Sequence, residues 1–472
     1  MALTSLDGDS LAPHVNYWME GEILGYVGLD KSDDDMPEYW QNLFPGGAGA
    51  PARDTGGPTK WEPVSEEDAI KKPVVTSSTT FYTAAFDSTT ILSLEGSQAA
   101  VDKLVSSKVV KAAVEVFPTC LVEPQQEEGS SSSNNNVLQQ EEVQAHATWG
   151  LQAVKAMESG LTGKGVKVAL LDTGLDKEYL KHPAFAGVTI TAKNFTTSDM
   201  NATHDVRSHG THCLGTILGR PVNGMHIGVA PGITDVIIAK VIPDDGKGDS
   251  SMLVEALLWA WYEKGANIIN ISLAYDLPAK EQQLIKGGAN PLEASDEVMQ
   301  IYEKHKSFYQ KLISVLQLGT VLNRSPPLII AACGNGNTAS VRTRVQLPAA
   351  ADGVISVAAI KRTDQGYKAA TFSKLGASIC APGVDVLSAA AGGAAAGVLL
   401  RPDSGTSMAA PHVAGVAALW WQQLEGELGE GTAEAVRDKL LGGATKAGFA
   451  PGVPAPELTK AVGRGLVQAP PV

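Results

Sequence analysis

The sequence predicts an α/β fold: a doubly wound, mostly parallel sheet with helices on both faces, plus a smaller α+β N-terminal region. Two patterns predict this fold. Apolar runs of strand length occur at residues 166–171 and 328–332, and such runs are typical of strands buried inside a parallel sheet. Helix-forming stretches occur at residues 210–217 and 409–421. Strands that alternate with helices favour right-handed crossovers within one sheet.

Three short segments, far apart in the chain, each carry one member of a proton-relay system. Asp172 follows the first apolar run, His209 stands in Ser-His-Gly-Thr-His-Cys at 208–213, and Ser407 stands in Ser-Gly-Thr-Ser-Met-Ala-Ala-Pro-His at 404–412. A serine hydroxyl is a weak nucleophile at neutral pH, so it needs an imidazole to accept its proton and a carboxylate to orient that imidazole. The catalytic candidates are therefore Asp172, His209 and Ser407.

The local setting of each residue suits its role. Asp172 is expected at the carboxyl end of a strand, where open α/β sheets place their sites. His209 is expected in the first turn of one helix and Ser407 at the start of another, whose backbone N–H groups would face a developing oxyanion. Pro411 is expected in the first turn of this second helix, because a missing N–H breaks no helical bond there.

These segments resemble the subtilisin-like serine protease family, the subtilases, and the order Asp, His, Ser along the chain is that of subtilisin. The resemblance covers about residues 145–470. It implies a serine endopeptidase that cleaves polypeptide substrates through an acyl-enzyme intermediate. It also implies an oxyanion hole in which Asn335, within Cys-Gly-Asn-Gly at 333–336, donates its side-chain amide to the tetrahedral intermediate.

By resemblance, substrate binding adds an extended peptide to two exposed strands of the enzyme. The substrate-binding candidates on these strands are Gly246, Lys247, Gly248, Ser272, Leu273 and Ala274. The second strand departs from the family, which usually has Leu-Gly-Gly where this chain has Leu-Ala-Tyr, ending at Tyr275. We expect the added side chains to narrow the primary pocket or to reshape its mouth.

An insertion around residues 276–322 is a second departure, because the stretch between Ser272 and Asn335 is longer than is usual in the family. The second half of residues 283–321 has the pattern of an amphipathic helix. Two interpretations stay open at this point. The insertion covers the cleft or docks a partner, or it is a surface excursion without a role in the site.

The resemblance requires no cofactor, and calcium is possible but not assigned. Family members often bind calcium through an Asp after a His-Pro pair, whereas here His182 and Pro183 are followed by Ala184. The loss of a carboxylate from an oxygen cage weakens the binding of a hard cation. No metal ligand is therefore assigned in this chain.

The other histidines and the cysteines have structural interpretations. Three histidines near the motifs are interpreted as packing or hydrogen-bonding groups: His204, His212 and His412. The four cysteines do not resemble a dense disulfide framework: Cys120, Cys213, Cys333 and Cys380. Buried packing is expected for Cys213 and Cys333. The Cys after His-Gly-Thr-His also resembles the proteinase K branch, in which a thiol lies near the catalytic His. This resemblance predicts inhibition by mercurials.

The chain is expected to contain four parts. Residues 125–142 form a predicted flexible linker, because their Ser, Asn, Gln and Glu runs are too polar to bury. Residues 143–472 form the predicted catalytic domain. Residues 1–75 are acidic, contain many Gly and Pro, and have no clear fold, and residues 76–124 have an α+β pattern.

The α+β pattern has strands predicted at residues 80–94 and 109–117, with a helix predicted at 97–106. Its tail, Val-Glu-Val-Phe at 114–117 and Val-Glu-Pro at 122–124, resembles the tail of a subtilisin propeptide. This resemblance implies that the N-terminal segment is a partner of the catalytic domain and inhibits it in cis. An unrelated adaptor is the alternative interpretation.

Charge and composition exclude several classes of protein. Residues 1–142 hold 8 Lys and Arg against 23 Asp and Glu, and residues 143–472 hold 29 against 28, so no nucleic-acid surface is indicated. No apolar run approaches membrane-spanning length. The N-terminus lacks the basic start and apolar core of a secretory signal. An intracellular protein is therefore favoured, although most of the family is secreted.

Two other functional classes fit the sequence less well. A dinucleotide-binding oxidoreductase is suggested by Gly-Asn-Gly at 334–336 after a strand, but the helix and the acidic residue that this fingerprint needs do not follow. A catalytically inactive, protease-like binding module would lack a member of the triad. All three members are present in this chain.

Overall fold

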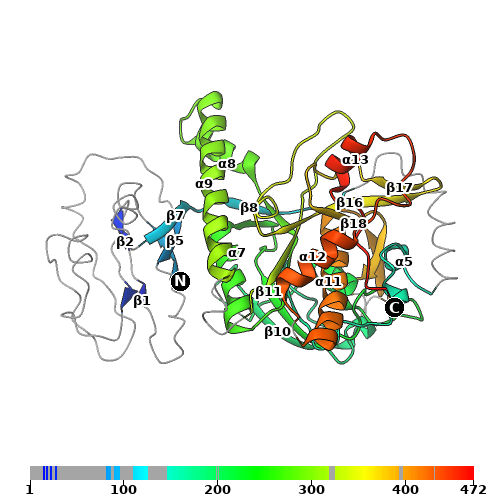
Figure 1. Ribbon diagram of the computed structural model, residues 1–472. Helices are drawn as coiled ribbons and strands as arrows, with labels where there is room; N and C mark the ends of the chain where they lie inside the picture. Colours follow the sequence, from blue (N-terminus) through cyan, green and yellow to red (C-terminus); the bar gives the residue numbers. More distant parts are fainter. Residues whose placement is uncertain are drawn as a thin grey trace, which may run out of the picture. The chain divides into compact units, whose positions relative to one another are not determined.

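The structure is a computed structural model (Figure 1). It describes short strands within residues 14–28 and 81–95, and then residues 110–125, 146–317, 325–392 and 397–471 except 198, 200 and 430. The chain divides into two compact units, Met1–Val116 and Phe117–Val472. The polar stretch that was predicted to be a linker lies outside the described residues, apart from Gln125.

An eight-stranded sheet forms the centre of the second unit. Its order is β10-β11-β9-β13-β15-β16-β17, with β18 also paired to β16. The pairings are parallel except that of β16 with β17. The strands are β9 (Lys167–Asp172), β10 (Thr189–Asn194), β11 (Asp235–Lys240), β13 (Ile268–Ile271), β15 (Leu328–Ala332), β16 (Ile355–Thr363), β17 (Gly366–Ala369) and β18 (Ile379–Pro382). The predicted α/β fold with a mostly parallel sheet is confirmed.

Helices lie on both sides of this sheet. In the view of Figure 1, α7 and α9 lie on one side of β10 and β11, and α11 and α12 lie on the other. Strands covered on both faces need no polar alternation, and all four residues of β13 are buried. The helices are α5 (Trp149–Ala153), α6 (His209–Leu218), α7 (Ser250–Leu258), α8 (Leu277–Lys286), α9 (Pro291–Gln317), α11 (Thr406–Leu428), α12 (Ala433–Gly443) and α13 (Ala455–Val462).

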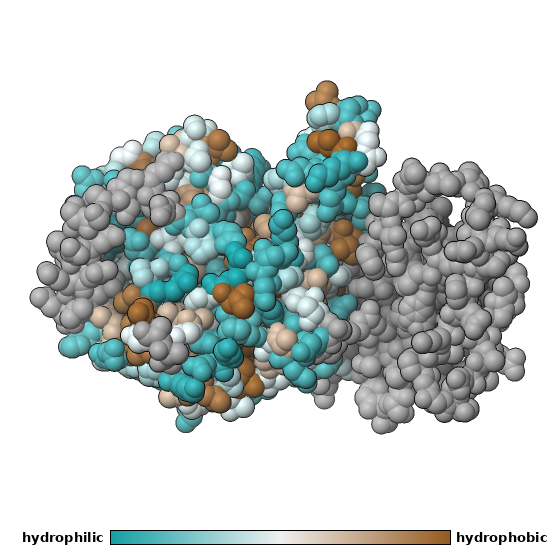
Figure 2. All heavy atoms as spheres, turned by 180° about the vertical axis from the view of Figure 1, so that it is seen from behind, coloured by the Kyte–Doolittle hydropathy of each residue, from teal (hydrophilic) through white to brown (hydrophobic). Residues whose placement is uncertain are grey.

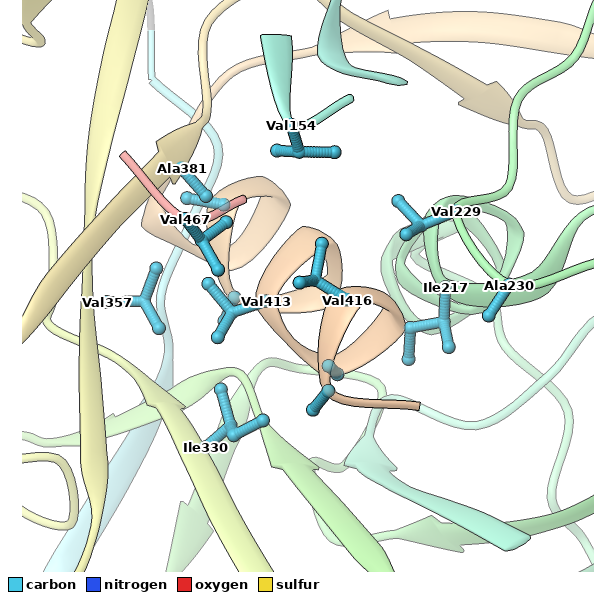
Figure 3. Close-up of a cluster of buried hydrophobic side chains, with 14 of the residues drawn as sticks. Val154, Ile217, Val229, Ala230, Ile330, Val357, Ala381, Val413, Val416 and Val467 are labelled. Carbon is cyan, nitrogen blue, oxygen red and sulfur yellow. The ribbon is translucent and has the colours of Figure 1, made fainter. Parts of the chain in front are cut away.

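Helix α11 runs through the hydrophobic core, and this packing fixes the position of its first turn. Figure 3 shows its side chains Val413 and Val416 among those of Ile217, Ile330 and Val357. Small residues on α11 allow close packing. A Cβ atom added to Gly415 would lie 2.5 Å from the Cβ atom of Val229. A bulkier residue there would force the helix, and the motif at its N-terminus, to shift.

The prediction that Pro411 lies in the first turn of its helix is wrong. Helix α11 begins at Thr406, so Pro411 stands inside the helix. Proline has no N–H to donate to the carbonyl group four residues earlier, which is that of Ser407. The structure supplies another donor, because the Cys213 thiol lies 3.3 Å from the Ser407 carbonyl oxygen.

The insertion contains two helices, α8 and α9. The predicted amphipathic helix is confirmed over residues 302–317, and α9 begins earlier, at Pro291. Helix α9 is 27 residues long, and its buried residues include a set that recurs every three or four positions: Ala294, Val298, Ile301, His305, Phe308 and Leu312. Figure 2 shows a face on which polar residues predominate and apolar residues appear at the projecting end of the insertion. Leu292, the second residue of α9, is 85% exposed.

Two smaller sheets complete the second unit. Strand β8 (Pro118–Leu121) lies between β12 (Lys247–Asp249) and β14 (Leu273–Tyr275), antiparallel to both. Strands β19 (Val386–Ala389) and β20 (Leu400–Asp403) form an antiparallel pair. In the described part of the chain, no helix is long and apolar enough to cross a membrane.

The first unit contains a three-stranded antiparallel sheet of order β6-β5-β7. The single strand predicted at residues 80–94 is wrong, because β5 (Phe81–Phe86) and β6 (Thr90–Glu95) pair with each other. The polar residues at 87–89 are of types that favour turns. The helix predicted at 97–106 lies outside the described residues. The other strands are β7 (Val110–Glu115), β1 (His14–Val15), β2 (Trp18–Met19), β3 (Glu22–Ile23) and β4 (Val27–Gly28).

Candidate active site

Asp172 and His209 meet at the carboxyl end of β9. Asp172 is the last residue of β9 and His209 is the first residue of α6. The imidazole Nδ1 of His209 lies 2.7 Å from the Asp172 carboxylate, and both side chains are buried. A Cβ atom at Gly210 would lie 2.2 Å from the Gly174 carbonyl oxygen, so only glycine allows the helix to begin this close to the strand.

Burial and charge act in opposite directions on the His209 imidazole. Burial is the largest single influence and disfavours the charged ring, but the Asp172 carboxylate and the Cys213 side chain together outweigh it, so the pKa of His209 is raised well above its ordinary value. The other ring nitrogen, Nε2, is buried and has no hydrogen-bond partner among the described residues. In the neutral ring, with its proton on Nδ1, this is the nitrogen that can accept a proton.

Asp205 is a site residue that the sequence reasoning missed. Its buried carboxylate accepts hydrogen bonds from the Thr173 hydroxyl at 2.8 Å and from the Thr211 N–H and hydroxyl at 2.9 and 2.7 Å. Thr173 follows Asp172 directly, and Thr211 lies in the first turn of α6. Asp205 thus fastens the end of β9 to the start of α6. An acidic residue four positions before His209 was the only signal in the sequence.

Ser407 lies in the first turn of α11, and its hydroxyl donates to the Val122 carbonyl oxygen at 3.0 Å. Cys213 connects this helix start with the imidazole. Its sulfur lies 3.3 Å from the Ser407 carbonyl oxygen and 3.8 Å from His209 Nδ1. Burial raises the pKa of Cys213 to about 11, so the thiol stays protonated and can donate. One buried side chain therefore contacts both Ser407 and His209.

Asn335 follows β15 and is oriented by the helix start of α11. Its side-chain oxygen accepts hydrogen bonds from the Thr406 N–H and hydroxyl, each at 3.0 Å. This arrangement points the amide nitrogen away from Thr406. That nitrogen donates to the Glu123 carbonyl oxygen at 2.8 Å. The amide donor and the Ser407 hydroxyl thus face the same short segment of chain.

That segment, β8 and the residues after it, lies as a third strand between the two predicted substrate-binding strands. Leu121 N–H donates to the Gly246 carbonyl at 3.2 Å, and Val122 N–H donates to the Ser272 carbonyl at 3.4 Å. Cys120 is paired with both Lys247 and Ala274. Gly248 and Leu273 are paired with Thr119 and Leu121. All six substrate-binding candidates therefore contact an extended peptide.

The segment turns sharply at Val122. Glu123 N–H donates to the Leu121 carbonyl at 2.9 Å, which closes a three-residue turn. As a result, the carbonyl that meets the Ser407 hydroxyl is that of Val122, whereas the carbonyl that meets Asn335 is that of Glu123. No single carbonyl has both contacts. The Glu123 carboxylate also forms an ion pair with Arg207.

Tyr275 lies away from the primary pocket that it was expected to narrow. It pairs with Thr119, three residues before Val122, and its ring stacks on that of Phe117. The added side chain therefore shapes the far end of the groove. The expectation failed because strand pairing fixes which residue of β8 each residue of β14 meets, and this pairing cannot be read from the sequence alone.

The remaining histidines have the structural surroundings that were predicted. Burial lowers the pKa values of His212 and His412 to about 4, and each ring binds a backbone carbonyl. His204 Nδ1 accepts a hydrogen bond from the Lys177 N–H. The four cysteines are free thiols.

Two places bear on metal binding. His182 contacts the Ala184 N–H through Nδ1 and the Leu399 carbonyl through Nε2, so both ring nitrogens have backbone partners. Within the described ranges, one group has the spacing of a metal site, Asp172, His209 and Cys213. Its carboxylate and imidazole are hydrogen-bonded to each other, and its thiol is held in the protonated form. These groups are arranged to move a proton, and no metal is assigned to them.

Comparison with known proteins gives consistent matches to one family. The family model described as "Subtilase family" matches residues 163–463. Subtilisin BL of Lederbergia lenta is 33% identical over 276 residues, which are 57% of this chain and 82% of that protein. M-protease of Shouchella clausii (strain KSM-K16) is 33% identical over 276 residues, 57% of this chain and 58% of that protein. An intracellular serine protease of Paenibacillus polymyxa is 32% identical over 283 residues, 59% of this chain and 71% of that protein.

Proposed function

Because the chain belongs to the subtilase family of serine endopeptidases, we propose that it hydrolyses peptide bonds with Asp172, His209 and Ser407 as its catalytic triad. We further propose that its own segment around β8 inhibits it in cis. The observation that carries both proposals is the peptide-like occupant of the groove. The Ser407 hydroxyl and the Asn335 amide each bind a backbone carbonyl of one segment, which is itself paired between β12 and β14.

The proposed reaction is acyl transfer. His209 Nε2 accepts the Ser407 proton while the Ser407 oxygen forms a bond to the carbonyl carbon of the substrate. Asp172 holds the ring with its proton on Nδ1 and stabilises the imidazolium that forms. The Asn335 amide and the Ser407 N–H stabilise the oxyanion. The imidazolium then protonates the leaving amine, and water releases the acyl group by the same steps in reverse order. This route uses protein groups and water, without an organic cofactor.

The turn at Val122 supports inhibition by the intact segment. An attacked carbonyl carbon has to face the serine oxygen while its oxygen lies on the amide donor. In the segment, these two contacts are divided between the carbonyl groups of Val122 and Glu123. Such a strand occupies the groove and presents no bond in the geometry for attack. The segment is present at a high effective concentration, because it belongs to the same chain as the groove.

Labelling with a fluorophosphonate probe tests the triad, because the probe attaches to an activated serine oxygen. We expect the full-length chain and its Ser404→Ala control to be labelled and Ser407→Ala to remain unlabelled. Ser404 lies three residues earlier, and its hydroxyl accepts the Asp385 N–H. Labelling of Ser407→Ala at the rate of the unmutated chain would refute Ser407 as the nucleophile. The alternative, an inactive binding module, predicts no labelling even in a variant with an opened groove.

A further inference from the structure

The side chain of Phe117 is enclosed by other side chains at the far end of the groove, five residues before Val122. It is fully buried. Its ring stacks on Tyr275 with 4.8 Å between ring centroids, and it meets the edge of the His305 ring at 5.5 Å and 77°. Both geometries are the ones that aromatic rings prefer. We call the site formed by Tyr275 and His305 around this ring the aromatic pocket.

The pocket is built from the two departures of this chain from its family. Tyr275 ends β14, and His305 lies on α9 of the insertion. The Tyr275 hydroxyl lies 2.8 Å from His305 Nδ1 and 3.5 Å from the Tyr309 hydroxyl, so hydrogen bonds fix the two walls relative to each other. The insertion therefore reaches the groove, which favours the first of its two interpretations.

The backbone at and beside Phe117 is fixed by hydrogen bonds that do not involve the Phe117 side chain. Phe117 N–H donates to the Ser250 hydroxyl at 3.0 Å, and Ser250 N–H donates to the Phe117 carbonyl at 2.9 Å. Asp276 N–H donates to the Pro118 carbonyl at 2.9 Å. These contacts continue the pairing of β8 with β12 and β14. They place any bound peptide in the same register, so the residue at this position always faces the aromatic pocket.

The alternation of side chains along the strand agrees with this register. Phe117, Thr119 and Leu121 are buried, whereas Pro118 and Cys120 between them are partly exposed. Successive side chains of a strand point to opposite faces. The aromatic pocket thus lies on the enzyme-facing side of the strand, in line with the positions of Thr119 and Leu121.

We propose that the aromatic pocket is a substrate subsite, selective for an aromatic residue five positions before the residue whose carbonyl is attacked. Phe117 occupies it while the chain's own segment fills the groove, and the corresponding residue of a substrate occupies it when the segment has left. The proposal rests on the proposed function, because it assumes that substrates use the groove of β8. Loss of a buried aromatic ring weakens binding by about tenfold to a hundredfold.

Peptide binding tests the pocket without requiring catalysis. The full-length chain would carry Ser407→Ala to prevent cleavage, with Phe117→Ala and Leu121→Lys to weaken its own segment. Fluorescent nine-residue peptides would have the sequence of residues 115–123 with Ser in place of Cys120. One keeps the Phe, a second has Ala in its place, and a third has the Phe and the Pro after it exchanged. Fluorescence anisotropy gives the three dissociation constants, and the far-ultraviolet circular dichroism of the variant checks its folding.

We expect the Phe peptide to bind at least about tenfold more tightly than the other two. The preference should shrink toward one when Tyr275→Ala is added, and it should persist with Leu292→Ala, which changes an exposed residue of the same insertion. The chain's own segment competes equally with all three peptides, so it leaves their ratios unchanged. Equal affinities for the Phe and Ala peptides, equal affinities for the Phe and exchanged peptides, or no binding at millimolar peptide would each overturn the subsite.

The outcome is separable from the proposed catalysis. If the chain binds the Phe peptide selectively, but the same variant with Ser407 restored is never labelled by the fluorophosphonate although its groove is open, the aromatic pocket is kept and the proposed triad is lost. A parent that is labelled at Ser407, combined with equal binding of all three peptides, keeps the triad and loses the pocket.

Discussion

Leu121 offers a direct test of inhibition by the chain's own segment. Its side chain is 4% exposed, and its N–H binds the Gly246 carbonyl. In Leu121→Lys the apolar burial is lost, about 2 kcal/mol for a leucine, and a charge has to be desolvated or has to displace the strand. Together these changes disfavour the occupied groove by about 3 kcal/mol, which is roughly a hundredfold in the ratio of occupied to open states.

The assay is hydrolysis of a fluorogenic tetrapeptide by the full-length chain. We expect kcat/KM of Leu121→Lys to exceed that of the unmutated chain by up to about a hundredfold, with a limit set by complete opening. The matched control is Gln125→Lys, which adds the same charge beyond the turn and keeps the backbone bond from Gln125 N–H to the Ser404 carbonyl. The fluorophosphonate labelling rate should rise in parallel, because it reports access to Ser407 without a requirement for deacylation.

Equal kcat/KM for Leu121→Lys and the unmutated chain, with both chains folded and labelled at equal rates, would refute inhibition in cis. An equal increase in Gln125→Lys would show that added charge, and not the loss of the Leu121 side chain, causes the effect. Either result would leave the pairing of β8 as a structural contact without a regulatory role.

Three further predictions follow from the site. Asp205→Asn places an amide donor where Thr211 donates twice. Urea unfolding should therefore show a loss of about 3 kcal/mol in the free energy of unfolding, and kcat should fall. An unchanged kcat would contradict the positioning role of Asp205. The acidic limb of the pH profile of kcat/KM should lie above pH 6.5, because the raised pKa of His209 keeps the ring charged there. The stability that this charge contributes is complete below the pKa of the unfolded state and is lost as pH rises through the pKa of the folded state. A limb at or below pH 6.5 would contradict the raised pKa. A small mercurial should inactivate the unmutated chain and leave Cys213→Ala active. Iodoacetamide should react slowly at pH 8, because the pKa of the Cys213 thiol is about 11. Equal sensitivity of both chains to the mercurial would rule out Cys213 as its target.

The elements that carry Asp172, His209 and Asn335 could be predicted because each follows from a local pattern. A continuous apolar run produces a strand covered on both faces, and a polar residue directly after it lies at the carboxyl end of the sheet. That reasoning placed Asp172 at the end of β9 and Asn335 after β15. It did not find Asp205, because a lone acidic residue in a loop looks the same whether it binds solvent or accepts hydrogen bonds from Thr173 and Thr211.

Features that depend on contacts between distant parts of the chain could not be predicted. The position of Pro411 was misjudged because it depends on where α11 begins, and the missing donor is compensated by Cys213 from another helix. The role of Tyr275 was misjudged because it depends on the register of β14 against β8. A shift of one residue in that register would direct alternate side chains to the opposite face.

The two ends of the β8 segment are held by different kinds of contact. Under the proposed inhibition in cis, this difference accounts for a strand that fills the groove without offering a bond for cleavage. At the far end, Phe117 is enclosed by rings and by backbone hydrogen bonds that fix the register. At the near end, the Glu123 carboxylate pairs with Arg207, and the Asn335 amide holds the Glu123 carbonyl. A strand fixed at both ends has to absorb any mismatch in length between them. The three-residue turn at Val122 lies between the two anchors, and it is the turn that separates the carbonyl at Ser407 from the carbonyl at Asn335. A substrate that lacks the near anchor has no such constraint, so its backbone can stay extended and bring one carbonyl to both groups.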